Sequence, residues 1–211
     1  MPKVTEEFVL AKREEIIDAC AMLYETMSFK DITFKDIAKV TSLNRTSIYN
    51  YFETKEEIFL AFMQREYELW IKDLDKLCQS KKNLSRIALA DELAKTLDKR
   101  GKLLKLMTMN HFDMEGNSSY ERLVDFKRVY GSSIRGVKHC LDRFCPDMRE
   151  DEKKEFLYAF FPFIYGIYPY VDVSEKQKKA MEEAGVEFIY HSVYDISFNC
   201  LKKLLGADTK K

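Results

Sequence analysis

The amino-acid sequence predicts an all-α protein made of two helical domains, and three observations lead to this prediction. Apolar residues recur at intervals of three and four along almost the whole chain, which is the spacing of amphipathic helices. The chain holds only 7 Gly and 4 Pro in 211 residues, too few for the many turns of an all-β protein. Hydrophobic residues make up 46% and charged residues 33%, a balance typical of a globular chain with a sizeable core.

The expected helices differ in length between the two parts of the chain. Up to Phe52 they are short and closely spaced, beginning with an apolar stripe over residues 16–27. Beyond Thr54 they are long. Their apolar stripes cover residues 59–77, 126–144 and 188–204, and the last one stops at Gly206, a suitable residue to end a helix. We therefore expect a first domain at residues 1–55 and a second at 56–211, with the boundary inside a shared helix.

Composition and charge exclude several classes of protein. The formal net charge is zero, so nucleic-acid binding would have to come from a local surface. The five cysteines contain no C-x-x-C pair, which argues against a disulfide scaffold and favours a reducing compartment. Residues 1–15 lack the apolar core of a signal peptide, and no apolar stretch reaches the ~20 residues of a membrane span. We expect a cytoplasmic protein without membrane contact.

A helix-turn-helix pattern lies in the first domain. Thr33 and Asp36 are spaced as a capping box that starts a short helix, and Asn44 can cap the next helix after a turn. The inner face of that second helix is expected to carry Ile48, Tyr51 and Phe52. Two short helices joined by a turn of a few residues, the second with a small polar outer face, form the helix-turn-helix plan.

The outer face of the second short helix suits double-stranded DNA. Arg45 can pair with guanine or a phosphate, and Asn50 can pair with adenine. Tyr49 and Lys55 can reach phosphates, while the helix N-terminus at Thr33 offers backbone N–H groups to an anion. Lys55 stands in the first turn of its helix, against the helix dipole, which an outside anionic partner would explain. The predicted DNA-contact residues are Thr33, Arg45, Thr46, Ser47, Tyr49, Asn50 and Lys55.

The stretch IAKVTSLNRTSIYNYFETKEEIF resembles the DNA-binding signature of the tetracycline-repressor (TetR) family of transcriptional regulators. The resemblance covers about residues 8–60. It implies that the three N-terminal helices bind operator DNA as a homodimer, and that a small molecule bound by the C-terminal domain releases the DNA. The family often has glycine where Ser42 and Thr46 stand here. We expect mild strain in the turn at Ser42 and an altered base preference at Thr46.

Aromatic residues gather in the second domain between positions 156 and 170. A role in the core or in a dimer interface is the stronger interpretation for most of them, and we expect the dimer to pair helices near 151–171 and 187–205. A few can line an apolar pocket with sparse polar groups, the usual form of a small-molecule site. The candidate ligand-binding residues are Trp70, Met107, His111, Phe112, Phe126, Tyr130, Phe161 and Tyr165. No charged residue in the stripes indicates a specific counter-charge for a ligand, so an apolar or aromatic effector is expected.

No catalytic constellation appears in the sequence. The histidines His111, His139 and His191 form no H-E-x-x-H motif, and the nucleophile-elbow, dinucleotide and P-loop motifs are absent. The group His139, Cys140 and Cys145 is spaced too loosely to indicate a metal site. We therefore expect a repressor-type regulator with no enzyme activity, cofactor or metal. The alternatives are a helical-bundle enzyme or cofactor-binding protein that uses its helix-turn-helix for protein contacts, and a regulator-like fold whose N-terminal domain binds a protein.

Overall fold

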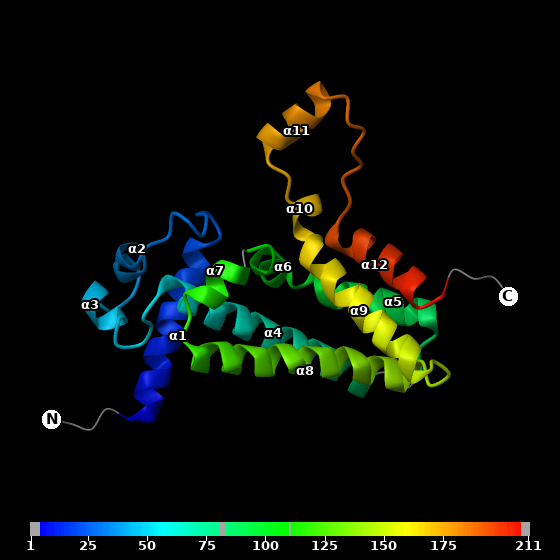
Figure 1. Cartoon of the computed structure of the whole chain (residues 1–211), viewed down its shortest axis with the longest axis horizontal. Helices are drawn as coiled ribbons and strands as arrows, with labels where there is room; N and C mark the ends of the chain where they lie inside the picture. The colour runs from blue at the N-terminus through cyan, green and yellow to red at the C-terminus, as the bar shows by residue number, and fades with distance from the viewer. Residues whose placement is uncertain (1–4, 81–82, 110, 208–211) are drawn as a thin grey trace. The chain divides into compact units, whose positions relative to one another are not determined.

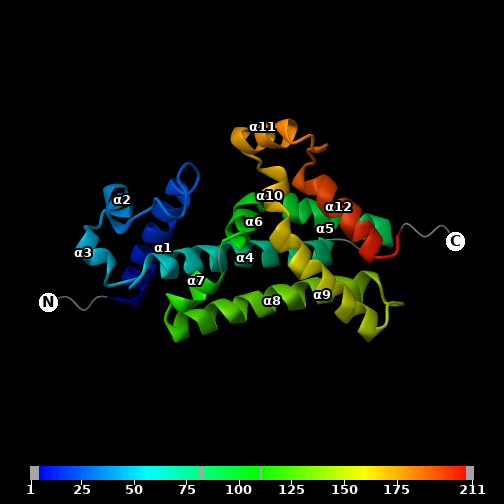
Figure 2. The same ribbon diagram turned by 45° about the horizontal axis from the view of Figure 1, so that its top comes forward.

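The computed structural model describes residues 5–80, 83–109 and 111–207, with the backbone alone at 111–113. These residues form twelve helices and no strand (Figures 1 and 2), so the predicted all-α class is confirmed. The helices are α1 (Glu6–Leu23), α2 (Phe34–Lys39), α3 (Arg45–Ile48), α4 (Lys55–Ser80), α5 (Arg86–Asp98), α6 (Gly101–Met107), α7 (His111–Gly116), α8 (Tyr120–Phe144), α9 (Glu150–Gly166), α10 (Tyr168–Val171), α11 (Glu175–Glu183) and α12 (Val193–Leu204). No described helix has the length and apolar character needed to cross a membrane.

The chain forms two compact units. The first unit comprises Met1–Arg65 and Asn110–Val129, and the second comprises Glu66–Met109 and Tyr130–Lys211. The helices α4 and α8 each continue from one unit into the other. The segment 110–129 thus belongs to the compact unit that contains the helix-turn-helix. Because compactness does not say which segment performs which function, the functional boundary between residues 55 and 56 stays a prediction.

The core of the first unit is built from the inner faces of α1 to α4. The sequence places an apolar residue at every third or fourth position of α1, and Ile16 and Cys20 are fully buried as a result. Phe59 on α4 is fully buried between the rings of Tyr24 and Phe29, with edge-to-face centroid distances of 5.2 and 4.8 Å. This small core supports the short helices α2 and α3.

The second unit is a bundle in which α12 packs chiefly against α5, and α9 packs against α6 and α12. The C-terminal end of α12 follows the sequence closely: Gly206 has φ of 63°, the left-handed conformation that ends many helices. The predicted role of Gly206 is therefore confirmed.

The structure corrects the prediction for the segment before α12. A helix over 187–205 was expected from the apolar stripe that includes Phe188 and Ile189, but residues 186–192 are not helical. The helix α12 begins only after Ser192, whose hydroxyl accepts from the Asp195 N–H at 3.0 Å while the Asp195 carboxylate accepts from the Ser192 N–H at 3.2 Å. This capping box sets the start of the helix. The preceding segment and α11 extend away from the other helices of the second unit (Figures 1 and 2).

Candidate nucleic-acid interface

Side-chain caps define the two short helices of the helix-turn-helix. The Thr33 hydroxyl accepts from the Asp36 N–H at 3.3 Å, and the Asp36 carboxylate accepts from the Thr33 N–H at 3.2 Å, so the predicted capping box is confirmed. Hydrogen bonds from the Lys39 ammonium and the Thr33 hydroxyl lower the pKa of Asp36 to about 2. The side chain of Asn44 accepts from the Ser47 N–H at 2.8 Å and caps α3 as predicted.

Residues 45–52 divide into buried and exposed positions largely as the sequence predicts, although α3 ends at Ile48 and residues 49–51 form a turn rather than the expected continuation of the helix. Ile48 and Phe52 are 0% and 1% exposed and belong to the core, whereas Tyr51 is only half-buried. Arg45, Thr46, Tyr49 and Asn50 are exposed, and Ser47 is half-buried. The ring of Tyr49 packs edge-to-face on Phe34 with a centroid distance of 4.6 Å, which orients its phenol at the surface.

An open groove of about 510 Å³ lies on the surface of the first unit beside α2 and α3. It brings together four of the seven predicted DNA contacts, namely Thr33, Arg45, Tyr49 and Lys55. Thr46, Ser47 and Asn50 do not line the groove. Two carboxylates, Glu53 and Glu56, share its walls with three cations, Lys35, Arg45 and Lys55. The groove is therefore polar and carries a small local excess of positive charge.

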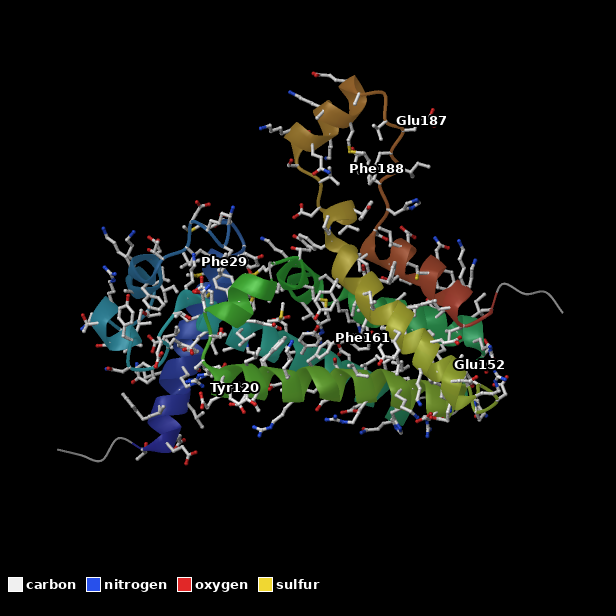
Figure 3. The ribbon with its side chains drawn as sticks, in the orientation of Figure 1. Phe29, Tyr120, Glu152, Phe161, Glu187 and Phe188 are labelled. Atoms are coloured by element: carbon white, nitrogen blue, oxygen red, sulfur yellow. The ribbon has the colours of Figure 1, made fainter. Side chains whose placement is uncertain are left out.

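Lys55 has a partner inside the first unit. Its ammonium donates to the Phe29 carbonyl at 2.6 Å and lies 4.2 Å from the centre of the Phe29 ring (Phe29 is labelled in Figure 3). A lysine in the first turn opposes the helix dipole, and the sequence alone suggested an outside anion as the explanation. The Phe29 carbonyl and ring supply an internal explanation instead. A phosphate contact by Lys55 stays a prediction.

The turn between α2 and α3 is held by side chains of α1. The Glu15 carboxylate accepts from the Ser42 N–H, and the Lys12 ammonium donates to the Ser42 hydroxyl at 2.6 Å. Lys12 also pairs with Glu15 at 2.8 Å. The hydrogen bond from the Lys12 ammonium, together with those from the backbone N–H and hydroxyl of Ser42, lowers the pKa of Glu15 to about 2. No described non-glycine residue has a positive φ, so the prediction of backbone strain in the turn at Ser42 is wrong.

The segment 117–122, which we call the latch, contacts the end of the helix-turn-helix. The guanidinium groups of Arg122 and Arg13 both donate to the Tyr51 carbonyl at 3.3 Å, and they lie 5.7 and 4.5 Å from the centre of the Phe52 ring. The hydroxyl of Thr54 donates to the Asn117 carbonyl at 2.7 Å. The latch therefore ties the first turn of α8 to the residues that follow α3.

Glu57 on α4 binds the latch at Ser119. It is 3% exposed, and its carboxylate accepts from the Glu53 N–H at 3.0 Å and the Ser119 N–H at 3.1 Å. Burial by itself would raise the pKa of Glu57, but these backbone hydrogen bonds outweigh burial and lower the pKa below its ordinary value. A buried ionised carboxylate thus holds both the start of α4 and the start of α8.

Sequence reasoning missed two features of this unit. Lys35 lines the groove beside Arg45, and its position two residues after the cap Thr33 was a usable signal for an anion contact. Arg122 was also missed, and no signal could have found it, because its partner Tyr51 lies 71 residues earlier in the chain.

The second unit collects five of the eight predicted ligand-binding residues. Trp70, Tyr130 and Phe161 are joined through ring contacts with centroid distances of 5.7 to 6.4 Å, which also include Tyr67 (Phe161 is labelled in Figure 3). The phenol oxygens of Tyr67 and Tyr165 lie 3.0 Å apart. We call Tyr67, Trp70, Tyr130, Phe161 and Tyr165 the aromatic cluster; four of them are predicted ligand-binding residues, and Tyr67 is an addition. Burial raises the pKa of Tyr67 well above its ordinary value, so this phenol is uncharged at neutral pH.

Among the remaining predicted ligand-binding residues, the structure describes the side chains of Met107 and Phe126. Met107 is 2% exposed on α6 of the second unit, and Phe126 is 3% exposed in the first unit. The side chains of His111 and Phe112 lie outside the described residues. Inside the cluster, the Trp70 indole N–H donates to the Thr96 hydroxyl at 3.0 Å, and that hydroxyl donates to the Leu93 carbonyl at 2.7 Å. The polar edge of the ring is therefore satisfied.

A separate apolar groove of about 700 Å³ lies on the second unit between α9 and the segment before α12. Its walls include Phe163, Ile167, Tyr170 and Phe188. Tyr158 on α9 and Ile189 remain 83% and 75% exposed. An apolar surface of this kind marks a binding or assembly surface.

The chain is similar to known regulators in sequence and in fold. It is 29% identical over 75 residues to an uncharacterised HTH-type transcriptional regulator of Bacillus subtilis, a match that covers 36% of this chain. The chain spans little more than a third of the length of the curated regulators it matches, 37% in this case. The fatty acid degradation regulator FadR of Bacillus halodurans has a similar fold, with a TM-score of 0.62, 13% identity and coverage of 95% and 97% of the two chains. FadR of Bacillus subtilis, solved with stearoyl-CoA, has a TM-score of 0.60, 13% identity and coverage of 93% and 99%.

Two family profiles account for most of the chain. Residues 16–62 match the profile of bacterial regulatory proteins of the tetR family, which covers the helix-turn-helix and its caps. Residues 64–190 match the tetracyclin repressor-like C-terminal domain, and this second match alone covers well over half of the 211 residues. Together with the polar, capped helix-turn-helix and the larger helical unit that follows it, these matches establish that the chain belongs to the TetR family of transcriptional regulators.

Proposed function

We propose that this chain is a ligand-responsive repressor that binds operator DNA as a homodimer and releases it when a small apolar or aromatic effector binds. The observation that carries the proposal is the groove on the first unit, where Thr33, Arg45 and Tyr49 surround one exposed surface. A polar helix face of small side chains, with a cation and a phenol at its edge, fits the major groove and its phosphates.

We assign base recognition and phosphate contact to different residues. Arg45 and Asn50 read base edges, because both are exposed and can form paired hydrogen bonds with guanine and adenine. The groove residues Thr33 and Tyr49 contact phosphates, together with Lys35. Lys55 joins them by exchanging the Phe29 carbonyl for a phosphate oxygen, and Thr46 and Ser47 lie against the floor of the major groove of the DNA. The domain boundary at 55/56 follows from this assignment.

We assign dimerisation to α9 and α12 with their neighbouring segments. The exposed Tyr158 on α9 and the apolar groove beside Phe163 support this surface, since a monomer seldom leaves such residues in water. A stable dimer needs more than ~1,000 Å² of buried surface. Two recognition helices must then fit half-sites about 34–36 Å apart, or a multiple of that distance. Sedimentation at micromolar concentration tests this assignment, and a monomer would contradict it.

Effector binding is assigned to the aromatic cluster and the predicted residues near it. The helix α4 carries Trp70 within the cluster and Lys55 in its first turn, and α8 carries Tyr130 within the cluster and Arg122 in its first turn. A ligand that separates these rings displaces one or both helices and thereby the residues that hold the helix-turn-helix. Moving the population from 1:99 to 99:1 requires about 5.5 kcal/mol of differential affinity. Operator DNA must weaken effector binding by the same factor.

Long-chain acyl-CoA thioesters are the first effectors to test. One regulator of similar fold was solved with stearoyl-CoA, and separation of the buried rings of the aromatic cluster would open an apolar lining of the kind that an acyl chain requires. Operator affinity should fall in the presence of the effector. An effector whose affinity is the same with and without operator would contradict the coupling.

The decisive experiment measures DNA binding with DNA from the protein's own upstream region. Arg45→Ala should cost about 1–3 kcal/mol on that DNA and less on unrelated DNA, because a base contact is lost. Tyr49→Phe should weaken binding to both DNAs and flatten the salt dependence, because a phosphate contact carries no sequence information. The matched control is Arg128→Ala, an exposed arginine on α8 far along the chain from the helix-turn-helix. Unchanged sequence preference in Arg45→Ala would contradict the assignment.

A further inference from the structure

Two thiols meet inside the second unit, at a place that the proposed function does not use. Cys78 near the end of α4 and Cys140 on α8 are 4% and 0% exposed, and their sulfur atoms lie 3.2 Å apart. The two residues are 62 positions apart in the sequence. The two thiols lie this close because α4 packs against α8.

A glycine explains why the thiols meet. One helical turn before Cys140, a Cβ atom at Gly136 would lie only 3.2 Å from the Leu74 Cδ1 atom, and Leu74 lies one turn before Cys78. Residues four apart share a helix face. These two contacts therefore place one face of α4 against one face of α8, with the two helices running in the same direction. The missing side chain at Gly136 lets the helices approach closely and brings the two sulfur atoms together.

We propose that Cys78 and Cys140 form a reversible disulfide that ties α4 to α8 when the protein meets a peroxide. A disulfide bond is about 2.05 Å long, so the sulfur atoms must approach each other by about 1.2 Å. Rotation of two side chains that are already in contact can supply much of this movement. Disulfides in reducing compartments are usually of this transient kind.

The reaction balances with hydrogen peroxide as the oxidant. The Cys78 thiolate attacks one peroxide oxygen, the O–O bond breaks, and the departing hydroxide takes up a proton as water. The Cys140 sulfur then attacks the sulfenic sulfur of Cys78, and the second oxygen leaves as water. Two thiols and one peroxide thus give one disulfide and two molecules of water, with each sulfur losing one electron.

The surroundings of the two thiols assign the first step to Cys78. Burial raises the pKa of Cys78, and the Asp75 carboxylate on the same helix adds to this effect, while a hydrogen bond from Cys140 and the charge of Arg143 oppose it. The pKa of Cys140 is raised further, by burial and then by its contact with Cys78. Because both pKa values lie above the ordinary value, the rate of oxidation should rise about tenfold per pH unit near neutral pH.

The experiment treats the full-length reduced protein with hydrogen peroxide, blocks the remaining thiols with N-ethylmaleimide and maps the peptides without reduction. The expected result is one cross-linked product that contains Cys78 and Cys140, lacks two hydrogen atoms and disappears on treatment with dithiothreitol. Cys145→Ser is the matched control, because Cys145 is equally buried in the same unit and should leave the product unchanged. The proposal would be overturned if Cys78 and Cys140 carried N-ethylmaleimide and were not cross-linked in protein whose other residues had been oxidised by the peroxide.

Thermal unfolding gives an independent readout in wild-type protein, so the test does not depend on the folding of a variant. A disulfide that closes a loop of about 60 residues should raise the melting temperature by about 5–10 °C, and dithiothreitol should reverse the increase. Cys78→Ser should show no such increase after the same treatment. An unchanged melting temperature in protein whose cross-linked peptide has formed would contradict the proposed tie between α4 and α8.

Discussion

The helix-turn-helix of the first unit keeps its functional side chains at the surface, whereas the aromatic cluster of the second unit keeps its side chains in contact with one another. Arg45 on α3 and Asn50 in the turn after it are exposed, and α3 is held by a local cap. Trp70 and Tyr67 are both 0% exposed and are held by residues from distant segments. A residue on a polar surface can be replaced while the fold is kept. In a close-packed cluster, replacing one side chain changes the packing of its neighbours.

The strongest test of this comparison is Trp70→Ala. The indole is fully buried, contacts Phe161 and donates to Thr96, so its removal leaves a cavity and takes one hydrogen bond from the Thr96 hydroxyl. The free energy of unfolding should fall by about 3–5 kcal/mol, as measured by denaturant titration. Tyr158→Ala, at a side chain that is 83% exposed, is the control and should change stability by less than about 0.5 kcal/mol in the monomeric state. Equal losses in the two variants would break the comparison.

The next test asks whether the latch serves the DNA-binding surface. Arg122→Ala removes a hydrogen bond to the Tyr51 carbonyl and a cation above the Phe52 ring. Operator affinity should fall about tenfold, because a charged hydrogen bond worth about 1.5 kcal/mol is lost from the support of α3. Fluorescence anisotropy measures the affinity, and circular dichroism checks that helical content is retained. Operator affinity equal to that of wild type would mean that Arg13 alone holds Tyr51.

A third test uses the lowered pKa of Glu57. A carboxylate whose pKa is lower in the folded state than in the unfolded state stabilises the protein above the unfolded value, and this stabilisation is lost as the pH falls through the folded value. Glu57→Gln should be less stable than wild type by roughly 1–3 kcal/mol at neutral pH. The difference should shrink as the pH falls below about 4.5, the ordinary pKa of a glutamate. A difference that is constant from pH 7 to pH 3 would rule out an ionised Glu57 as the cause.

The smallest expected effect concerns two buried serines of the second unit. Within the described residues, the Ser197 hydroxyl on α12 has no hydrogen-bond partner, whereas the Ser133 hydroxyl on α8 donates to the Tyr130 carbonyl at 2.7 Å. Ser197→Ala should raise the free energy of unfolding by about 0.5–1 kcal/mol, since an unpaired polar group is removed. Ser133→Ala should lower it by a similar amount. Destabilisation by Ser197→Ala would show that a water molecule or a partner satisfies this hydroxyl.

Local features of the fold could be predicted because their causes lie within a few residues. The caps at Thr33 and Asn44 and the helix end at Gly206 all depend on groups no more than about four residues away. The same holds for the helical period that buries Ile48 and Phe52. Such features are decided by hydrogen bonds and side-chain spacing along the chain itself.

The contacts that only the tertiary structure decided join residues far apart in the sequence. Lys55 finds the Phe29 carbonyl 26 residues away, Arg122 finds Tyr51 at 71 residues, and Tyr67 meets Tyr165 at 98 residues. No local spacing encodes these partners, because each depends on how whole helices pack. The late start of α12 has, by contrast, a local cause: an apolar stripe continues through Phe188 in the sequence, but the capping box of Ser192 and Asp195 starts the helix only after Ser192. By itself, the sequence determined the class, the caps and the polar face of this regulator, and packing decided which of its buried side chains meet.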